Sequence, residues 1–174
     1  QAQLGSTLAG ISQEQLHAIA KALLAARNVV YLGFRQNRNF AAYLRWQLLQ
    51  VLPTAQQCLP GAGETLGEYL ALVGRQDMVV LFALRRSVPL ARRFAEQARA
   101  QGAQVLVITD GLSEVPPATW LLRAQAESDS AFDNHASLMM LCHLISSHTL
   151  ALAGQAGRRQ LAEIEVAHDR LGEM

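Results

Sequence analysis

The chain has 174 residues, enough for one domain with a single buried core. Its 15 Lys and Arg residues nearly balance 14 Asp and Glu residues, so the net charge of +1 excludes a strongly basic nucleic-acid surface and an acidic tail. No unbroken apolar run approaches the roughly 18 residues of a membrane span. Cys58 and Cys142 lie far apart. They predict a reduced, cytoplasmic protein with inert thiols.

Short apolar runs alternate with amphipathic stretches, a pattern typical of strands that alternate with helices. The predicted helices are 12–27, 40–51, 65–73, 88–101, 132–153 and 158–171. The predicted strands are 29–32, 56–59, 78–83, 104–109 and 120–124. This order predicts a three-layer αβα fold, in which a doubly wound, five-stranded parallel sheet is accompanied by long flanking helices.

Local signals mark several boundaries of these elements. Ser12 is a predicted N-cap, and Gln15 would complete a capping box with it. Residues 34–39 are predicted to be a polar loop, and Gly154 with Gly157 marks a break before the last helix. The stretch 132–153 is apolar nearly all round, which is typical of a helix buried in the fold or between subunits. We therefore expect a homodimer or a tetramer that uses this helix together with the first and last helices.

The stretch 79–110 is the clearest part of the pattern. Two apolar runs flank an amphipathic helix and form a βαβ unit with buried parallel strands. Ligands of such sheets bind at the carboxyl ends of the strands. The loop 84–89 lies at that position and carries two adjacent arginines, Arg85 and Arg86. The sequence therefore predicts that an anionic group binds there.

Several residues resemble motifs of the SIS domain, the sugar-isomerase fold. They are Gly33 after the first strand, Ala41 eight residues later, Gly102-Ala103 after a helix, and the run Val107-Ile108-Thr109-Asp110. The resemblance implies a flavodoxin-like strand order, with the ligand at the carboxyl ends of the first and third strands.

The C-terminal part is similar to the sensor domain of RpiR/MurR-type bacterial transcription regulators. The similarity is carried by Phe132-Asp133-Asn134-His135, Ile164-Glu165 and His168-Asp169-Arg170-Leu171. It implies that residues 12–174 form a SIS domain that binds a carbohydrate derivative and regulates transcription in carbohydrate metabolism. It also implies that residues 1–11 are a lead-in or linker from an N-terminal helix-turn-helix domain. DNA would be bound only through that N-terminal domain.

The two loops that hold phosphate in SIS domains depart from the family pattern here. The usual Gly-x-Gly-x-Ser loop reads Gly33, Arg35 and Asn37, and the usual Ser-x-Ser-Gly-x-Thr loop reads Ala83, Arg85, Arg86 and Val88, with Ser87 at the free position. Arg38 adds a fourth arginine. Because the guanidinium fork matches phosphate or carboxylate, these loops predict a site for a small anionic metabolite, a phosphosugar or a carboxylate. The alternative is that they are surface arginines paired with Glu64, Glu68 or Asp129.

Further candidates lie just before the long helix, where relatives often place ligand contacts. Ser128, Asp129 and Ser130 serve either there or as a capping cluster, and His135 lies near the expected ligand. Asn37 either binds the ligand or caps a helix. The predicted ligand-binding residues are Gly33, Arg35, Asn37, Arg38, Arg85, Arg86, Ser87, Ser128, Asp129 and His135.

Three functions remain open on the sequence. The favoured hypothesis is a non-catalytic sensor domain that binds no specific DNA by itself and no membrane. The second is a phosphosugar isomerase with Glu64, Glu68 or His135 as the general base. The third is a dimerisation domain whose ligand site is dead. No cofactor is expected, because the sequence lacks metal-ligand spacing, a P-loop and a dinucleotide fingerprint.

Overall fold

The computed structural model describes residues 5, 7, 9–85, 87–112, 114–129 and 131–173. Five parallel strands form one sheet in the order β2-β1-β3-β4-β5. They are β1 (Asn28–Leu32), β2 (Ala55–Leu59), β3 (Asp77–Ala83), β4 (Gln104–Thr109) and β5 (Trp120–Arg123). The strand order reverses between β1 and β3, as in flavodoxin-like sheets. The predicted doubly wound parallel sheet is therefore confirmed.

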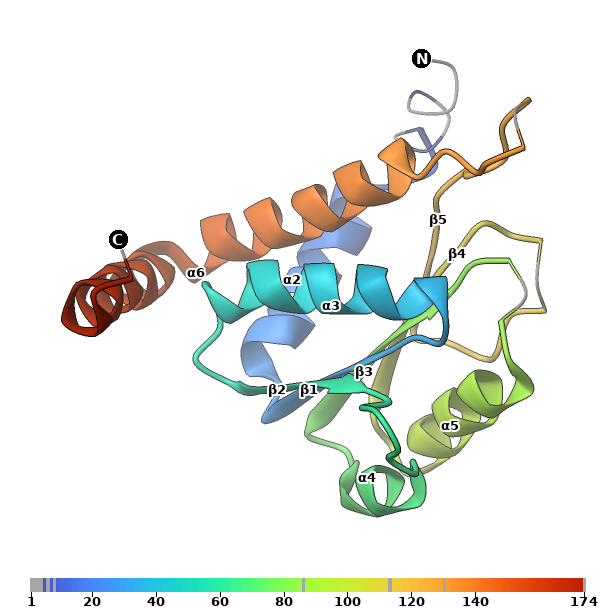
Figure 1. Cartoon of the computed structure of the whole chain (residues 1–174), viewed down its shortest axis with the longest axis horizontal. Coiled ribbons are helices and arrows are strands. Elements are labelled where there is room, and N and C mark those ends of the chain that lie inside the picture. The colour runs from blue at the N-terminus through green and yellow to red at the C-terminus, as the bar shows by residue number, and fades with distance from the viewer. Residues whose placement is uncertain are drawn as a thin grey trace.

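Helices cover both faces of the sheet (Figure 1). One face carries α2 (Gln13–Ala25), α3 (Gln36–Leu49) and the first half of α6 (Ala136–Leu171), whereas α4 (Gly67–Leu72) and α5 (Pro89–Ala100) cover the other. Successive side chains of a strand point to opposite faces. Accordingly, Val80 and Phe82 pack beneath α3 and α6, while Val79 and Leu81 pack against α5. The apolar runs of the sequence are thus buried on both sides.

The starts of α3 and α6 and one capping contact of α2 differ from the prediction. The expected loop 34–39 is mostly helix, because α3 begins at Gln36 and not at residue 40. Helix α6 begins at Ala136 and not at residue 132, and its first backbone N–H donates to Asn134 Oδ1 at 3.0 Å. Ser12 caps α2 as predicted, but the Gln15 side chain donates to the Leu121 carbonyl and does not close the capping box. Short-range contacts of Asn134 and Ser12 thus mark the starts of α6 and α2, whereas no side chain caps α3.

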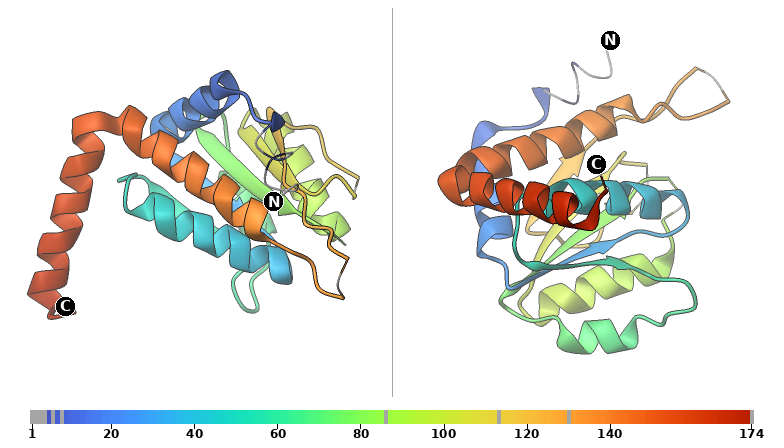
Figure 2. Two further views of the ribbon diagram at one scale, coloured as in Figure 1. Left: turned by 90° about the horizontal axis from the view of Figure 1, so that it is seen from above. Right: turned by 60° about the vertical axis from the view of Figure 1, so that its left-hand side comes forward.

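Helix α6 is divided by Gly154. Its φ of 56° and ψ of −123° are non-helical, and this φ favours glycine. The predicted break is confirmed at Gly154 but not at Gly157, which is buried within the continuing helix. The kink directs residues 155–171, here called the arm, away from the body of the domain (Figure 2).

The first half of α6 is a core helix of this chain. Leu138, Leu141 and Ile145 are fully buried against the neighbouring helices, while His143 and Ser147 lie exposed on the opposite side. By length and composition α6 could cross a membrane, but core helices of soluble proteins pass the same test. One stripe of 132–153 is thus buried in the fold, which is one of the two places that its apolar residues predicted, and its use in a subunit interface stays a prediction.

Candidate functional site

The loops after β1 and β3 meet at the carboxyl edge of the sheet. The buried Asn37 side chain joins them: its Nδ2 donates to the Leu84 carbonyl at 2.9 Å, and its Oδ1 accepts from the Leu84 N–H at 3.2 Å. Gly33 is required for the tight turn from β1 into α3, since a Cβ there would lie 2.4 Å from the Asn37 carbonyl oxygen. Asn37 therefore fixes the spacing of the two loops and is not a helix cap.

Two arginines of these loops have backbone conformations that L-residues rarely adopt. Arg35, the N-cap of α3, has a φ of 55° and a ψ of −127°, and Arg85 has a φ of 22°. Arg35 occupies the position of the second glycine in the SIS pattern, and the backbone has kept the conformation that glycine favours. Strained backbone of this kind concentrates at binding sites, because the surrounding contacts must hold it in place.

Two of the described arginines, Arg38 and Arg85, turn in different directions. Arg38 turns toward the end of β2, where its Nε donates to the Pro60 carbonyl at 2.8 Å. Arg85 turns toward the segment before α6 and forms an ion pair with Asp133, with 2.8 Å between Nη1 and Oδ1. Arg35 is exposed and pairs with no described residue. Arg86 lies outside the described residues.

The expected acidic partners are not the observed ones. No described arginine pairs with Glu64, Glu68 or Asp129; the partner of Arg85 is Asp133. Glu64 accepts from the Gly61 N–H at 2.8 Å, and Glu68 accepts from the Thr65 hydroxyl. Both carboxylates are therefore engaged within the loop that follows β2 and in α4. Neither is positioned by these contacts as a general base beside Arg85.

His135 connects the start of α6 with the start of α3. Its Nε2 lies 3.4 Å from Gln36 Nε2, and its ring centroid lies 4.8 Å from that of Phe40. The predicted place of His135 beside the ligand loops thus agrees with the structure. Its ring nevertheless packs on an aromatic neighbour, which is also a stabilising contact for the two helix starts.

A hollow of about 520 Å³ lies beside Arg85, at the carboxyl ends of β4 and β5. Asp110, Glu127, Ser128 and Asp129 contribute to its lining. Asp110 also accepts from the Arg85 N–H at 2.9 Å, which connects the hollow to the loop after β3. Within the described ranges, no group of His, Cys, Asp or Glu side chains is arranged to hold a metal ion. Ser128 and Asp129 line this hollow and do not cap α6, and Ser130 lies outside the described residues.

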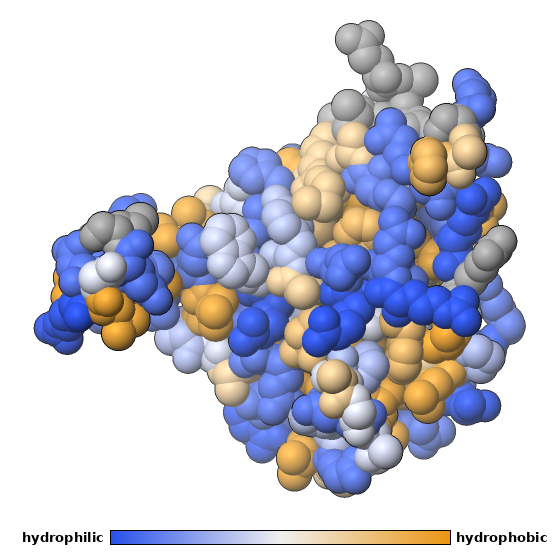
Figure 3. Space-filling view, viewed as in Figure 1, coloured by the Kyte–Doolittle hydropathy of each residue, from blue (hydrophilic) through white to orange (hydrophobic). Residues whose placement is uncertain are grey.

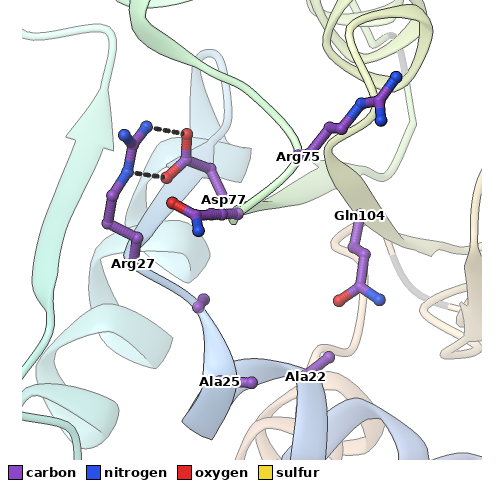
Figure 4. A pocket seen from close by; sticks show the side chains of 8 residues that line it. Ala22, Ala25, Arg27, Arg75, Asp77 and Gln104 are labelled. Carbon is purple, nitrogen blue, oxygen red and sulfur yellow. Dashed lines mark hydrogen bonds and ion pairs between the residues drawn. The ribbon is translucent and has the colours of Figure 1, made fainter.

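A second hollow, of about 370 Å³, lies at the opposite, amino edge of the sheet (Figure 4). The buried Asp77 carboxylate there accepts from Arg27 Nε, Arg27 Nη2, Asn28 Nδ2 and the Gly74 N–H, at 3.1, 2.7, 2.9 and 2.8 Å. Arg75 turns away from this hollow (Figure 4). Because Asp77 and Arg27 are already paired with each other, the amino edge has few polar groups left for a ligand to bind.

Sequence reasoning missed three parts of the carboxyl edge: the Leu84 backbone, Asp110 and Asp133. Asp110 follows β4 and Asp133 precedes α6, so their positions at strand and helix ends were visible signals. Their pairing with Arg85 was not visible, because the three residues lie 23 to 48 positions apart along the chain. Ser87, predicted as a contact, is half-buried between Arg85 and α5.

The family model of the SIS domain matches residues 22–153. The chain belongs to the SIS domain family. This match includes the whole sheet, both ligand loops and the first half of α6. A search of curated proteins gives no match.

Solved structures share this SIS fold along almost the whole chain. An RpiR transcription factor sugar isomerase domain from Sphaerobacter thermophilus is 19% identical, with a TM-score of 0.85 over 94% of this chain and 92% of that one. The Vibrio vulnificus NanR protein complexed with ManNAc-6P is 16% identical, with a TM-score of 0.76 over 98% and 66%. The C-terminal domain of a Francisella tularensis glucosamine-fructose-6-phosphate aminotransferase is 16% identical, with a TM-score of 0.68 over 88% and 43%. Regulators and enzymes thus share the fold.

Proposed function

We propose that this SIS domain is the ligand-sensing and dimerisation domain of an RpiR-type transcription regulator. It binds a small anionic metabolite in the cytoplasm and thereby controls DNA binding by a separate helix-turn-helix domain. The likeness to an RpiR sugar isomerase domain over nearly the full length of both chains supports the type of regulator. The observation that carries the ligand class is the exchangeable ion pair of Arg85 at the carboxyl edge.

The Arg85–Asp133 ion pair is suited to exchange because water reaches it. The Arg85 side chain is 51% exposed, and exposed pairs contribute little to stability. A ligand anion can therefore replace the Asp133 carboxylate at low cost. Asp133 lies three residues before α6, so its release changes the contacts that hold the start of this helix. Ligand binding is thereby coupled to the long helix of the domain.

The helix starts on both sides of Arg85 also favour an anion. Helices α3 and α5 begin at the carboxyl edge, and neither Arg35 nor Val88 caps its helix with a side chain. Uncapped N–H groups at helix N-termini attract phosphate and carboxylate groups. The N–H groups of Asn37, Arg38 and Ala91 already donate to backbone carbonyls, so the support for an anion is the positive end of each helix dipole beside the Arg85 guanidinium group.

The neighbouring acidic hollow favours a phosphosugar over a simple carboxylic acid. Asp110 and Asp129 present hydrogen-bond acceptors there, and sugar hydroxyl groups are donors that such carboxylates bind. The same carboxylates repel a second anionic group. A molecule with a phosphate at Arg85 and hydroxyl groups in the hollow fits both features. The binding of ManNAc-6P by NanR supports this ligand class.

A titration of the wild type and Arg85→Ala against sugar phosphates, ManNAc-6P included, and small carboxylic acids tests the proposal. Loss of a charge-assisted hydrogen bond should weaken phosphosugar binding about tenfold to a hundredfold. Arg93→Ala removes an exposed arginine of α5 and is the matched control, which should bind like the wild type. Equal affinity of Arg85→Ala and the wild type would contradict this site, and no binding by the wild type would favour a dead site.

The isomerase hypothesis is separated from the sensor hypothesis by turnover. Isomerisation requires a general base beside the substrate carbon. Among the three candidates, Glu64 and Glu68 are held in local contacts after β2, and His135 packs against Phe40. We therefore expect phosphosugars to bind without interconversion, as monitored by NMR of the bound sugar. Steady conversion that the change His135→Gln abolishes would favour the isomerase hypothesis over the sensor hypothesis.

A further inference from the structure

The arm presents an apolar stripe that the chain itself leaves partly uncovered. Gly157, Leu161, Ile164 and His168 recur at spacings of four, three and four, and these positions are buried or half-buried while most of the arm is exposed. The stripe faces a groove of about 420 Å³ whose other wall includes Trp46, 61% exposed, and Leu49, 39% exposed. Hydrophobic side chains thus face one another across an open space.

Figure 3 shows hydrophobic side chains on the projecting arm and on the part of the body beside it. A helix of the arm's length has marginal stability in water unless an apolar face is packed. The Gly154 kink directs the arm away from the body. The body of the same chain therefore covers the stripe only in part, and Leu161, Ile164 and His168 stay half-buried beside the open groove.

We propose that this groove receives the arm of a second copy of the chain, packed antiparallel about a two-fold axis. The 4-3-4 spacing is that of a helix that packs against another helix of the same kind, so the stripe is complementary to itself. Leu161 then packs against Ile164 of the partner subunit, and the two-fold axis repeats this contact. Trp46 extends the apolar surface that each arm meets.

Charge selects the antiparallel direction. In this register Arg158 and Glu165 of the partner subunit lie between the same two layers and on the same side of the stripe. The two-fold axis repeats the pair, so two Arg–Glu contacts flank the seam. A parallel arrangement places Gln160 beside Glu165 of the partner subunit and forms no such pair. The proposed interface therefore uses residues 158–171, the last of the three helices that the sequence pattern offered for a dimer.

Charge reversal tests this arrangement, with mass measured by light scattering over a dilution series. The wild type should be dimeric, and Arg158→Glu or Glu165→Arg should each raise the dimer dissociation constant about tenfold, because two attractive contacts become repulsive. The double variant should return to near the wild-type value. A monomeric wild type overturns the proposal, and so does a double variant that is no tighter than either single variant.

A second pair of variants tests the stripe itself. Leu161→Glu with Ile164→Glu should yield monomers, whereas Val166→Glu, on an exposed side of the arm, should stay dimeric. Both changes lie outside the domain core, so circular dichroism should show a folded body in each. A dimer that survives the double change overturns the proposal. Because no ligand is added, these results do not depend on the ligand assigned to the carboxyl edge.

Discussion

The two edges of the sheet treat their charged groups differently. At the amino edge a buried carboxylate, Asp77, accepts four hydrogen bonds, and two of them come from the Arg27 guanidinium group. At the carboxyl edge Arg85 pairs with Asp133, whose side chain is 19% exposed against 1% for Asp77, and two non-glycine residues have positive φ angles. The amino edge is therefore built for stability, whereas the carboxyl edge has contacts that a ligand can exchange.

The largest expected effect is at the amino edge. Asp77→Ala leaves the Gly74 N–H and the Asn28 amide without their acceptor, so unfolding by urea should show a loss of about 2–3 kcal/mol. Phosphosugar affinity of the folded variant should stay at the wild-type value. A variant that keeps its stability but loses the ligand would contradict the comparison, because the amino edge would then serve binding and not stability.

The loss of stability in acid is a second test of the role of Asp77 at the amino edge. Burial raises the pKa of Asp77, but hydrogen bonds from Arg27, Gly74 and Asn28 outweigh it and hold that pKa below the ordinary 3.8. A carboxylate with a lowered folded-state pKa stabilises the fold above its unfolded pKa, and this stability is lost as pH falls through the folded pKa. Urea titrations from pH 6 to pH 2 should therefore show a smaller acid loss in Asp77→Ala than in the wild type. Parallel pH profiles would contradict this.

Substitution of Asn37 should lower both the stability of the fold and the affinity for a phosphosugar. Asn37→Ala leaves the buried Leu84 N–H and carbonyl without a partner, which should cost about 2 kcal/mol of stability. It should also weaken phosphosugar binding, because the two ligand loops lose their fixed spacing. Asn39→Ala, at an exposed position of the same helix, is the control. If both variants unfold at the same urea concentration, Asn37 does not join the loops as described.

The smallest expected effect concerns backbone strain. Arg35→Gly relieves a φ of 55° that an L-residue adopts at a cost, whereas Arg35→Ala keeps the strain and removes the same guanidinium. The glycine variant should be more stable than the alanine variant by about 1 kcal/mol in thermal unfolding. Equal stability would mean that residue 35 adopts an ordinary conformation in solution.

Much of the fold could be predicted from the sequence, because it rests on short-range patterns. The apolar runs gave all five strands, and the Gly154 break was visible in the chain. The start of α6 was missed because a single polar contact of Asn134 marks it, and the start of α3 was missed because no side chain caps that helix. For 132–153 the sequence left burial in the fold and burial in a subunit interface open, because apolar residues alone do not reveal which elements cover them.

The candidate site was predicted less well, because its contacts join distant residues. Position along the chain placed Arg85, Asn37 and His135 at the correct edge. It did not reveal that Asn37 would be bonded to the Leu84 backbone or that Arg38 would turn toward Pro60. The partner of Arg85 was sought at Glu64, Glu68 and Asp129, whereas chain geometry brought Asp133 there. Such pairings depend on loop paths that composition and periodicity do not encode.

Asp133→Asn tests the central claim, that a ligand anion replaces the Asp133 carboxylate at Arg85, most directly. The variant removes the competing charge and keeps the shape of the side chain. Calorimetric titration with the phosphosugar that the wild type binds should show tighter binding, by about tenfold if one exposed ion pair no longer has to be broken. Affinity equal to or weaker than that of the wild type would contradict the account.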